Sequence, residues 1–490
     1  MISTIQQNVT TGELDMDTAV GQSITDIFHT QRAAHQALPM PDRNWRLARI
    51  ARCVDFVVEQ QEAIVEATIA DWQHKPASFV KAMELLPVLN HAKHIRKHLA
   101  GWMKDAPRAA DFPFNLMGAK AFVRYQPLGV VGVMVPWNGP VAMAMVAAMD
   151  AFSAGNRCMV KISEFSPHVA AMLEQQIPQY FDSSELAIVT GELEVSQQFA
   201  ALPFDHLMYT GSSDTARHIM AAAAKNLTPV TLELGGKSPV IVDSDCDIDY
   251  AAQRTMSGRL INTGQGCITP DYVLIEAARL EDFLAAAEAA TREMYPLSLG
   301  GRDYAAIATD AHYQRMLSLR QEALDSGCRC IEIDVGGESA KRQVNPLIVV
   351  NPPADSRLAT EEIFGPILVV FTCDGLQGAI DHINRGEKPL ALYYFGNESD
   401  KQQQVLDQTS AGGVAINEVM MQLMMSQLPF GGVGHSGMGS YWGGRAGFDR
   451  FSHAKSVFRQ GWYKKLGAMM DPPYGSTMEN MLKMQLKKPK

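Results

Sequence analysis

Short apolar runs alternate with helical segments through the middle of the chain, and this alternation restricts the possible folds more than any other feature. Residues 130–135 have the composition of a strand buried on both faces. Similar runs follow at residues 158–162, 186–190, 206–209, 230–234 and 239–242, separated by helical segments near residues 140–152, from Pro167 and from Asp214. The pattern predicts a doubly wound α/β sheet, in which ligands bind at the carboxyl ends of the strands.

Helical periodicity dominates the region before this alternation, and a second α/β pattern follows it. Across residues 20–110 apolar side chains recur at every third or fourth position, which predicts a helical scaffold with one buried face. The clearest example is Leu47, Ile50, Ala51, Val54, Val57 and Val58. Later strands are expected near residues 272–275, 346–350 and 390–395, with helices over residues 279–293 and 310–325. We therefore expect the 490 residues to form more than one domain.

Charge and hydropathy argue against two classes of partner. Lys and Arg number 43 against 53 Asp and Glu, a formal net charge of -10, and no basic stripe runs along the chain. Nucleic acid is therefore not expected as a partner. The longest apolar runs are far shorter than a bilayer span requires, and the polar first residues lack the features of a signal peptide, so we expect a soluble protein without a membrane span.

The cysteines indicate a compartment rather than a disulfide framework. Seven of them, an odd number, are scattered through the chain, which differs from the layout of disulfide-rich secreted domains. A cytoplasmic, reducing location is expected. Cys328 and Cys330 do not have the spacing of the usual metal-binding pair, and no His/Cys cluster follows them, so no metal site is predicted.

One cysteine stands out because of its surroundings. Cys267 ends the glycine-rich stretch Gly264-Gln265-Gly266, just after an amphipathic run at residues 248–261. A cysteine on such a turn can meet substrate and lie near backbone N–H groups, and it can attack an electrophilic carbon if its proton is removed. The alternative is an inert, half-buried cysteine.

Polar side chains at strand ends are candidate partners for this cysteine. Asn138 follows the run at residues 130–135 and can donate to an oxyanion, or it can simply form an Asn-Gly turn. Lys161 and Glu164 stand at the end of the next strand. A carboxylate there can accept hydrogen bonds from a nucleotide ribose, although solvated charges at strand ends are common.

Glu233 and the pair Glu361 and Glu362 each have a functional and a structural interpretation. Glu233 stands among apolar residues in the run at residues 230–234. Desolvation there would raise its pKa and suit it to general-base work, whereas on an edge strand it would face solvent. Glu361 and Glu362 precede Phe364 and a tight turn, and they can clamp a polar ligand or cap the turn. The G-x-G-x-x-G match at residues 432–437 lacks a βαβ unit around it, so we reject it as a dinucleotide fingerprint.

Together these motifs resemble those of the NAD(P)-dependent aldehyde dehydrogenases over about residues 20–475. Residues 232–237 resemble the glutamate signature of that family, and residues 264–267 resemble its cysteine signature. Further matches are residues 136–138, 361–366, 428–432 and 436–437. Residues 226–231, 270–272, 388–393 and 437–441 resemble the class 3 enzymes, and residues 155–157, 161–164 and 472–475 are most similar to the bacterial coniferyl-aldehyde dehydrogenase group.

The resemblance implies a role for each candidate residue. Cys267 would attack the aldehyde to give a thiohemiacetal and then a thioester, Asn138 would hold the oxyanion, and Glu233 would activate the water that releases the acid. The implied cofactor is NAD, with NADP as the alternative. Its implied contacts are Lys161, Glu164, Gly211, Ser212, Glu362, Phe364 and Trp137.

The resemblance also implies an α/β aldehyde dehydrogenase fold with three parts. Residues 1–117 and 129–234 would form a Rossmann-like cofactor domain, and residues 235–435 an α/β catalytic domain. Residues 118–128 and 436–490 would form a small β-arm for oligomerisation and a C-terminal segment. A homodimer is implied.

Some residues depart from the family pattern. Asp214 and Ala216 stand close to the implied phosphate site and predict weaker cofactor binding. Gly139 and Gly266 lack side chains and predict a wide substrate channel, with a methionine cluster as its wall or as ordinary core. The cluster is Met420, Met421, Met424 and Met425. The predicted substrate is a bulky aromatic or apolar aldehyde such as coniferyl aldehyde.

Three other functions compete with this one. In a CoA-acylating dehydrogenase a thiol takes the acyl group, and Glu233 argues against it because thiolysis has less need of a base. A binding protein of the same fold without catalysis would be compatible with the changes at residues 213–216. A cysteine hydrolase would need a partner among the 13 histidines and would leave Glu362 and Phe364 unexplained.

Overall fold

The computed structural model describes residues 19–112, 114–297, 301–338, 341–442, 444–463 and 471–486. Residues 1–18 of the predicted cofactor domain, and residues 464–470 and 487–490 of the predicted C-terminal segment, lie outside the described residues. Within the described part, no helix has both the length and the apolar character needed to cross a membrane.

Helices fill the first part of the chain, as predicted. They are α1 (Ala19–Ala37), α2 (Arg43–Glu59), α3 (Gln61–Trp72), α4 (Ala77–Val80), the π-helical turn η1 (Lys81–Leu85) and α5 (Leu86–Trp102). In α2 the buried apolar residues include Ile50, Cys53, Phe56 and Val57, whereas Val58 is 47% exposed. The prediction for Val58 was wrong because one residue turns a helix by about 100°, which moves its side chain off the buried stripe.

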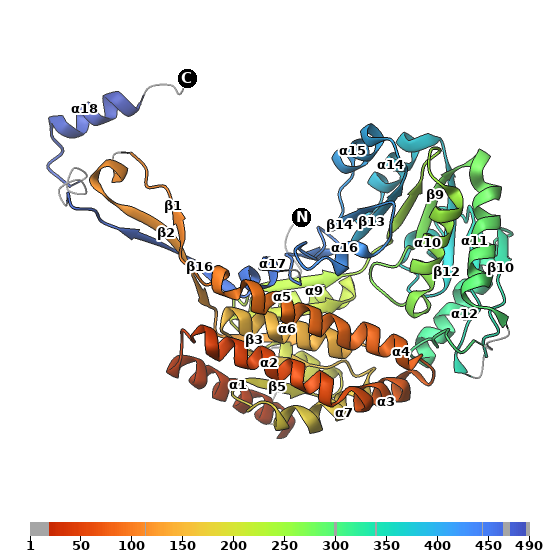
Figure 1. The fold of residues 1–490 in the computed structure, drawn as a ribbon, viewed down its shortest axis with the longest axis horizontal. Helices are drawn as coiled ribbons and strands as arrows, with labels where there is room; N and C mark the ends of the chain where they lie inside the picture. The colour runs from red at the N-terminus through yellow and green to blue at the C-terminus, as the bar shows by residue number, and fades with distance from the viewer. Residues whose placement is uncertain are drawn as a thin grey trace, which may run out of the picture.

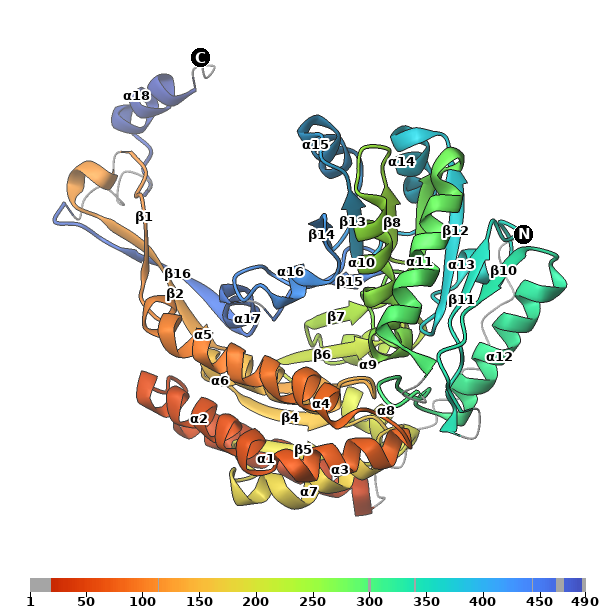
Figure 2. The same ribbon diagram turned by 45° about the vertical axis from the view of Figure 1, so that its right-hand side comes forward.

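A six-stranded sheet lies against these helices (Figures 1 and 2). Its strand order is β15-β7-β6-β3-β4-β5, and all neighbours are parallel except β15 and β7. The strands are β3 (Val130–Met134), β4 (Arg157–Lys161), β5 (Leu186–Val189), β6 (His206–Gly211), β7 (Val230–Leu234) and β15 (Gly437–Met438). Strand order reverses between β3 and β6, so the carboxyl ends of these two strands form the crevice where a doubly wound sheet binds ligands.

Helices cover both faces of this sheet. α6 (Pro140–Ala154) packs between the sheet and α2 and α5, and α7 (Pro167–Gln176) packs against α3. On the opposite face lie α1, α8 (Leu193–Ala200) and α9 (Ser213–Ala224). The predicted doubly wound arrangement is confirmed, although α8 was not predicted.

A seven-stranded sheet forms the second α/β unit, with strand order β10-β11-β12-β9-β8-β13-β14. Only β10 is antiparallel to its neighbour. The strands are β8 (Pro239–Val242), β9 (Tyr272–Glu276), β10 (Arg329–Glu332), β11 (Leu347–Val350), β12 (Ile367–Cys373), β13 (Ala391–Phe395) and β14 (Gly413–Ile416). The helices of this unit are α10 (Ile248–Leu260), α11 (Leu280–Met294), α12 (Asp310–Asp325), α13 (Arg357–Thr360), α14 (Gly375–Arg385), α15 (Ser399–Gln408) and α16 (Met421–Met424).

A three-stranded antiparallel arm projects from the body (Figure 1). It consists of β1 (Ala106–Arg108), β2 (Lys120–Pro127) and β16 (Ser452–Arg459), with β2 in the centre. α17 (Arg445–Arg450) lies at its base, and α18 (Ser476–Gln485) lies near its far end (Figure 2). β2 lies within residues 118–128, where the resemblance implies a β-arm, and it belongs to neither large sheet.

Candidate active site

The turn that carries Cys267 has an unusual backbone. After α10, Asn262 and Thr263 adopt left-handed conformations, with φ values of 50° and 55°. At Gly264, φ is 77° and an added Cβ would lie 2.2 Å from the carbonyl oxygen of Gly365. Non-glycine residues hold such conformations only when the surrounding structure fixes them, and such strain is frequent at active sites.

Gln265 is the side chain that fixes this turn. Its Nε2 donates to the carbonyl oxygen of Ala306 at 3.0 Å, and its Oε1 accepts from the backbone N–H of Ala308 at 2.9 Å. Thr263 adds a hydrogen bond from Oγ1 to the carbonyl oxygen of Ala305 at 2.7 Å. Gln265, two positions before Cys267, is thus anchored to the separate segment at residues 305–308. This anchoring gives the cysteine a defined position.

Cys267 lies where two cavities meet. The cofactor-side cavity opens at the carboxyl ends of β3 and β6 and has a volume of about 210 Å³. The substrate-side cavity lies on the other side of the cysteine, between α5, α6 and the segment after β14. Both cavities are lined by Asn138, Met143 and Cys267, so a half-buried thiol faces two separate ligand spaces.

Glu233 is buried beside the cysteine. β7 lies between β6 and β15, so the alternative of a solvent-facing edge strand is wrong, and Glu233 is only 1% exposed. Among the described residues, neither carboxylate oxygen has a hydrogen-bond partner of ordinary geometry. Burial raises the pKa of Glu233 to about 7, against smaller opposing effects of the Cys267 thiol and the Thr210 hydroxyl. A carboxyl group with this pKa can accept a proton near neutrality.

The reactivity of the Cys267 thiol depends on Glu233 as a base. Burial, and next the negative charge of Glu233, raise the pKa of Cys267 well above its ordinary value. The cysteine therefore remains protonated at neutral pH and becomes a nucleophile only when a neighbour removes its proton. Glu233 is the neighbouring carboxylate whose charge acts on this thiol, so it is the candidate proton acceptor.

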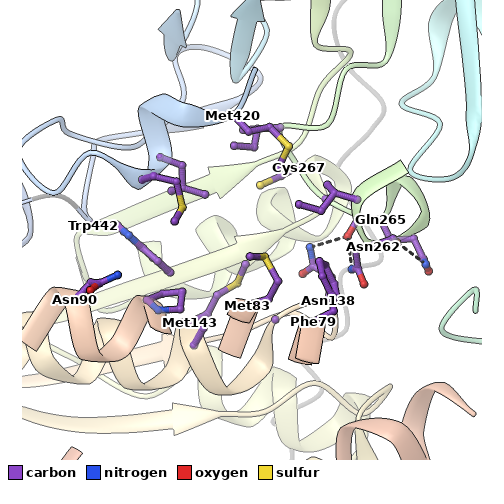
Figure 3. Close-up of a pocket in the computed structure, with 18 of the residues that line it drawn as sticks. Phe79, Met83, Asn90, Asn138, Met143, Asn262, Gln265, Cys267, Met420 and Trp442 are labelled. Carbon is purple, nitrogen blue, oxygen red and sulfur yellow. Dashed lines mark hydrogen bonds between the residues drawn. The ribbon is translucent and has the colours of Figure 1, made fainter. Parts of the chain in front are cut away.

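Asn138 approaches the same point from the end of β3. Its Nδ2 donates to the carbonyl oxygen of Gln265 at 3.4 Å, which is a long hydrogen bond. Figure 3 shows Asn138, Asn262 and Gln265 together on one side of the substrate-side cavity, and Asn90 and Trp442 on the other. The amide can exchange its long bond for a stronger one to an oxyanion.

The predicted cofactor residues divide into two groups. Trp137, Gly211, Ser212, Glu362 and Phe364 line the cofactor-side cavity. The rings of Trp137 and Phe364 lie edge to face with centroids 5.5 Å apart. Lys161 and Glu164 do not line it. Lys161 is the last residue of β4, one strand away, and Glu164 follows it, with Nζ and Oε2 3.9 Å apart.

Two features of this cavity fit a dinucleotide. Ser212 is the N-cap of α9, so the unpaired N–H groups and positive end of that helix begin at the cavity, as phosphate binding requires. An added Cβ at Gly235 would lie 1.9 Å from Oε2 of Glu362, so only glycine leaves room for that carboxylate. Burial raises the pKa of Glu362 to about 8.

Asp214 lies beside this helix terminus, where the sequence predicts an unfavourable charge. Its side chain is 93% exposed and forms an ion pair with Arg217. The pair offsets the charge, and solvent screens it, so the effect on cofactor affinity is expected to be small.

The substrate-side cavity has a largely apolar wall. The main apolar side chains are Phe79, Met83, Met143, Met420, Leu423 and Trp442. Met424 also lines it, but Met421 and Met425 do not and are 41% and 48% exposed. The predicted methionine wall is thus half correct, because successive residues of the short helix α16 point in different directions.

Comparison with known proteins decides the family. A family model described as aldehyde dehydrogenase family matches residues 11–457. The chain belongs to the aldehyde dehydrogenase family. It is 42% identical over 445 residues to the coniferyl aldehyde dehydrogenase of Pseudomonas sp. (strain HR199 / DSM 7063), covering 90% of this chain and 92% of that protein. It is 36% identical over 425 residues to aldehyde dehydrogenase family 3 member A2 of Pongo abelii, covering 85% of each.

A solved structure supports the same assignment. The substrate-bound state of Staphylococcus aureus AldH matches this aldehyde dehydrogenase with a TM-score of 0.87 and 33% identity, covering 94% of this chain and 99% of that chain. The predicted fold and family, and the similarity to class 3 and coniferyl-aldehyde enzymes, are confirmed. The protein is an oxidoreductase that converts aldehydes to carboxylic acids.

The glycine-rich segment after residue 430 has a structural role in this aldehyde dehydrogenase. β15 pairs Gly437 with Glu233, and an added Cβ at Gly432 would lie 1.9 Å from the carbonyl oxygen of Ser436. No helix starts directly after the segment, and α17 begins only at Arg445. Rejecting the dinucleotide fingerprint was therefore correct, and the glycines let this segment cover β7.

Several cavity residues were missed from the sequence. Phe79 and Met83 come from α4 and η1 in the helical scaffold, and Trp442 follows β15. Their local sequence shows only helical periodicity or a glycine-rich run, and packing between distant segments brings them to the cavity. A π-helical turn such as η1 often marks a functional site, but it has no reliable sequence signal.

Proposed function

We propose that this aldehyde dehydrogenase oxidises bulky aromatic or long apolar aldehydes through a covalent intermediate on Cys267. The observation that carries the proposal is the position of Cys267 between two cavities, with buried Glu233 beside it and Asn138 on the same side. A single thiol can then meet an aldehyde from one cavity and a cofactor from the other.

The first chemical step is the addition of the thiol. Glu233 accepts the proton of Cys267, and Sγ attacks the aldehyde carbon to give a thiohemiacetal. The carbonyl oxygen becomes an oxyanion, which accepts hydrogen bonds from Nδ2 of Asn138 and the backbone N–H of Cys267. Preorganised donors at this point stabilise charge that develops only in the transition state.

The second half of the reaction releases the acid. A bound nicotinamide supplies one chemical function, the acceptance of a hydride, which leaves a thioester on Cys267. Trp137, Glu362 and Phe364 line the cavity that would hold this ring and its ribose. Once its first proton has passed to solvent, Glu233 takes a proton from water and the water oxygen attacks the thioester carbon. The C–S bond breaks, the acid is released, and the Cys267 thiolate takes up the proton held by Glu233.

NAD is the proposed cofactor, with NADP as the alternative. Support comes from the N-terminus of α9 at the cavity and from Glu164, because a carboxylate near the adenosine ribose would repel a 2′-phosphate. Lys161 and Glu164 are proposed as the adenosine-ribose contacts from their place at the end of β4.

The substrate class rests on the substrate-side cavity. Its apolar wall suits an aromatic or long aliphatic body, and soft methionines adapt to different shapes. Asn90, across the cavity from Asn138 (Figure 3), offers a hydrogen-bonding group to a ring substituent. Coniferyl aldehyde combines these features, and a relative at 42% identity carries its name.

A panel of aldehydes tests the proposal. We expect NADH formation by the purified protein with kcat/KM higher for coniferyl aldehyde and long-chain aldehydes than for acetaldehyde or succinic semialdehyde. The product should be the free acid, with or without added CoA. A preference for short or anionic aldehydes would contradict the substrate class, and formation of acyl-CoA would support the CoA-acylating alternative.

A substitution at Gly139 tests the width of the channel. Its φ of -157° is extended, and an added Cβ would meet only Cε of Met143 at 3.7 Å, so the backbone accepts a larger residue. In Gly139→Phe we expect kcat/KM for coniferyl aldehyde to fall at least about 10-fold, with a change below about threefold for acetaldehyde. Gly101→Phe, where a Cβ meets nothing within 4 Å, is the matched control. Equal losses for both aldehydes would refute the steric argument.

We also infer the domain division, a homodimer and a cytoplasmic location. The arm presents exposed Leu116, Phe458 and Trp462, which a partner subunit can cover. The predicted boundaries at residues 117, 128, 234 and 435 are proposed on the resemblance and on the separation of the two sheets and the arm. All seven cysteines are free, which supports a reducing compartment. Analytical ultracentrifugation of the full chain tests the dimer.

A further inference from the structure

The start of α6 needs a capping group that its own sequence does not supply. α6 begins immediately after the Asn138-Gly139 turn, with Gly139 at the N-cap and no side-chain cap from that residue. The first N–H groups of a helix have no partner within the helix. Pro140 removes one such donor, but Val141 and Ala142 are buried and still carry theirs.

Glu84 supplies the missing acceptor from a distant part of the chain. Its Oε2 accepts from the backbone N–H of Ala142 at 2.8 Å, and the backbone N–H of Val141 lies near enough to the carboxylate to lower its pKa. Glu84 lies on the π-helical turn η1 and is completely buried. A carboxylate at this place also interacts favourably with the positive end of the helix dipole.

Lys75 provides a charge of opposite sign. It is 3% exposed, its Nζ lies 3.8 Å from the ring centroid of Trp72, and its charge interacts favourably with Glu84. Burial raises the pKa of Glu84, and Lys75 and the two backbone donors act against that rise. Burial of two charged groups is costly, and a neutral Ser, Thr or Asn side chain at the N-cap would satisfy the helix terminus at lower cost.

The position of Asn138 depends on this turn. Its side chain has one long hydrogen bond, 3.4 Å to the carbonyl oxygen of Gln265, so the backbone of residues 138–142 determines where the amide lies. A misplacement of about 1 Å of a catalytic group can cost about 100-fold in rate.

We propose that Glu84 is a positioning residue, whose carboxylate, with Lys75 as its counter-charge, fixes the first turn of α6 and thereby holds the Asn138 amide at the oxyanion position. The inference rests on the proposed function, because it assumes that Asn138 stabilises the oxyanion. Glu84 does not line either cavity and acts through Asn138.

A double-mutant cycle tests this coupling. In Glu84→Gln we expect kcat to fall about 10- to 100-fold, with KM for the aldehyde and the dissociation constant of NAD changed less than about threefold. Asn138→Ala should lower kcat about 100- to 1000-fold. In the Asn138→Ala background, Glu84→Gln should lower kcat by less than about twofold further, because the group that it positions is already absent.

The outcomes separate this inference from the proposed function. If Asn138→Ala leaves kcat unchanged, the oxyanion role fails, and the inference fails with it. If Asn138→Ala lowers kcat but Glu84→Gln multiplies that loss in full, the proposed function stands and the positioning role is overturned. A Glu84→Gln variant with normal kcat, or with losses mainly in KM or NAD affinity, also overturns it.

Two further variants guard against a folding artefact. Glu62→Gln makes the same chemical change at a glutamate 70% exposed on α3, and its kcat should stay within about twofold of the parent. Lys75→Met removes the counter-charge without changing the carboxylate, and because Lys75 also lines the substrate-side cavity, kcat and not KM is its diagnostic readout. Like Glu84→Gln, it should lower kcat in the wild-type background but hardly at all in the Asn138→Ala background. The test therefore remains decisive if Glu84→Gln does not fold. An additive effect of Lys75→Met would then overturn the inference.

Discussion

Replacement of Cys267 by alanine is expected to lower the rate of NADH formation by at least about 10⁴-fold, because no other group can form the covalent intermediate. The affinity for NAD should change little, because the glycines and aromatic side chains of the cofactor-side cavity remain. Steady-state kinetics with coniferyl aldehyde and a cofactor titration measure the two effects. Cys267→Ser should be almost as inactive, since a hydroxyl in the same place is a far weaker nucleophile than a thiol.

A matched cysteine serves as the control. Cys373 is half-buried in the second sheet, away from both cavities, and Cys373→Ala should retain activity within about twofold. Intact mass spectrometry of the wild-type protein during turnover should show an acyl adduct that Cys267→Ala lacks. A Cys267→Ala variant with a substantial part of the wild-type rate would refute covalent catalysis by this residue.

Much of the fold was predictable because the central strands are buried on both faces. β7 and β8 begin and end at the residues where the apolar runs begin and end. In such strands most side chains are apolar, so the run itself marks the strand. β12 was missed, although it is also an apolar run, because the preceding motif at residues 361–366 was interpreted as a turn without the strand that follows it. β10 and β14 were not predicted either.

The burial of Glu233 could not be predicted from the sequence. Alternation along β7 could not distinguish a buried carboxylate from an exposed one. The answer depends on β15, a strand of two residues that follows β7 by some 200 positions and pairs Gly437 with Glu233. Such a short glycine-containing strand has no propensity signal, because its pairing is determined by the sheet it joins.

The same limit applies to the substrate-side cavity and to Glu84. Phe79, Met83 and Glu84 lie in the amino-terminal helices, which were interpreted only as scaffold. Their functional contacts are with α6 and the segment around Met420, far away in the sequence. Motif resemblance found the reacting groups, which carry recognisable chemistry, but it could not find the side chains that shape and position the site.

Replacement of Glu233 by glutamine is expected to lower kcat by about 100- to 10,000-fold, because the amide has nearly the same shape but cannot accept a proton. The pH dependence should change as well. Glu233 has a pKa of about 7, so kcat/KM of the wild type should rise with pH through this value as the base ionises, and the rise should be absent in Glu233→Gln. Stopped-flow and steady-state measurements between pH 5.5 and 9 test both points.

A stability measurement distinguishes the loss of kcat in Glu233→Gln from unfolding of the variant. The folded-state pKa of Glu233 is raised from 4.5 to about 7, so its contribution to stability is fully present below pH 4.5 and is lost as pH rises through 7. Glutamine has no charge to bury, so Glu233→Gln should be at least as stable as the wild type at pH 8 in thermal unfolding. Glu361→Gln, an exposed acid paired with Arg315, is the matched control and should leave kcat and its pH profile unchanged.

A stronger nucleophile than water separates the two tasks of Glu233. Hydroxylamine attacks thioesters without a general base, so it should raise turnover of Glu233→Gln and give the hydroxamate if the loss lies in hydrolysis. If turnover does not recover, the loss lies in the first proton transfer from Cys267, whose raised pKa makes that step dependent on the same carboxylate. A variant with normal kcat and an unchanged pH profile would exclude Glu233 from both steps, and the proton acceptor would have to be sought elsewhere along the walls of the two cavities.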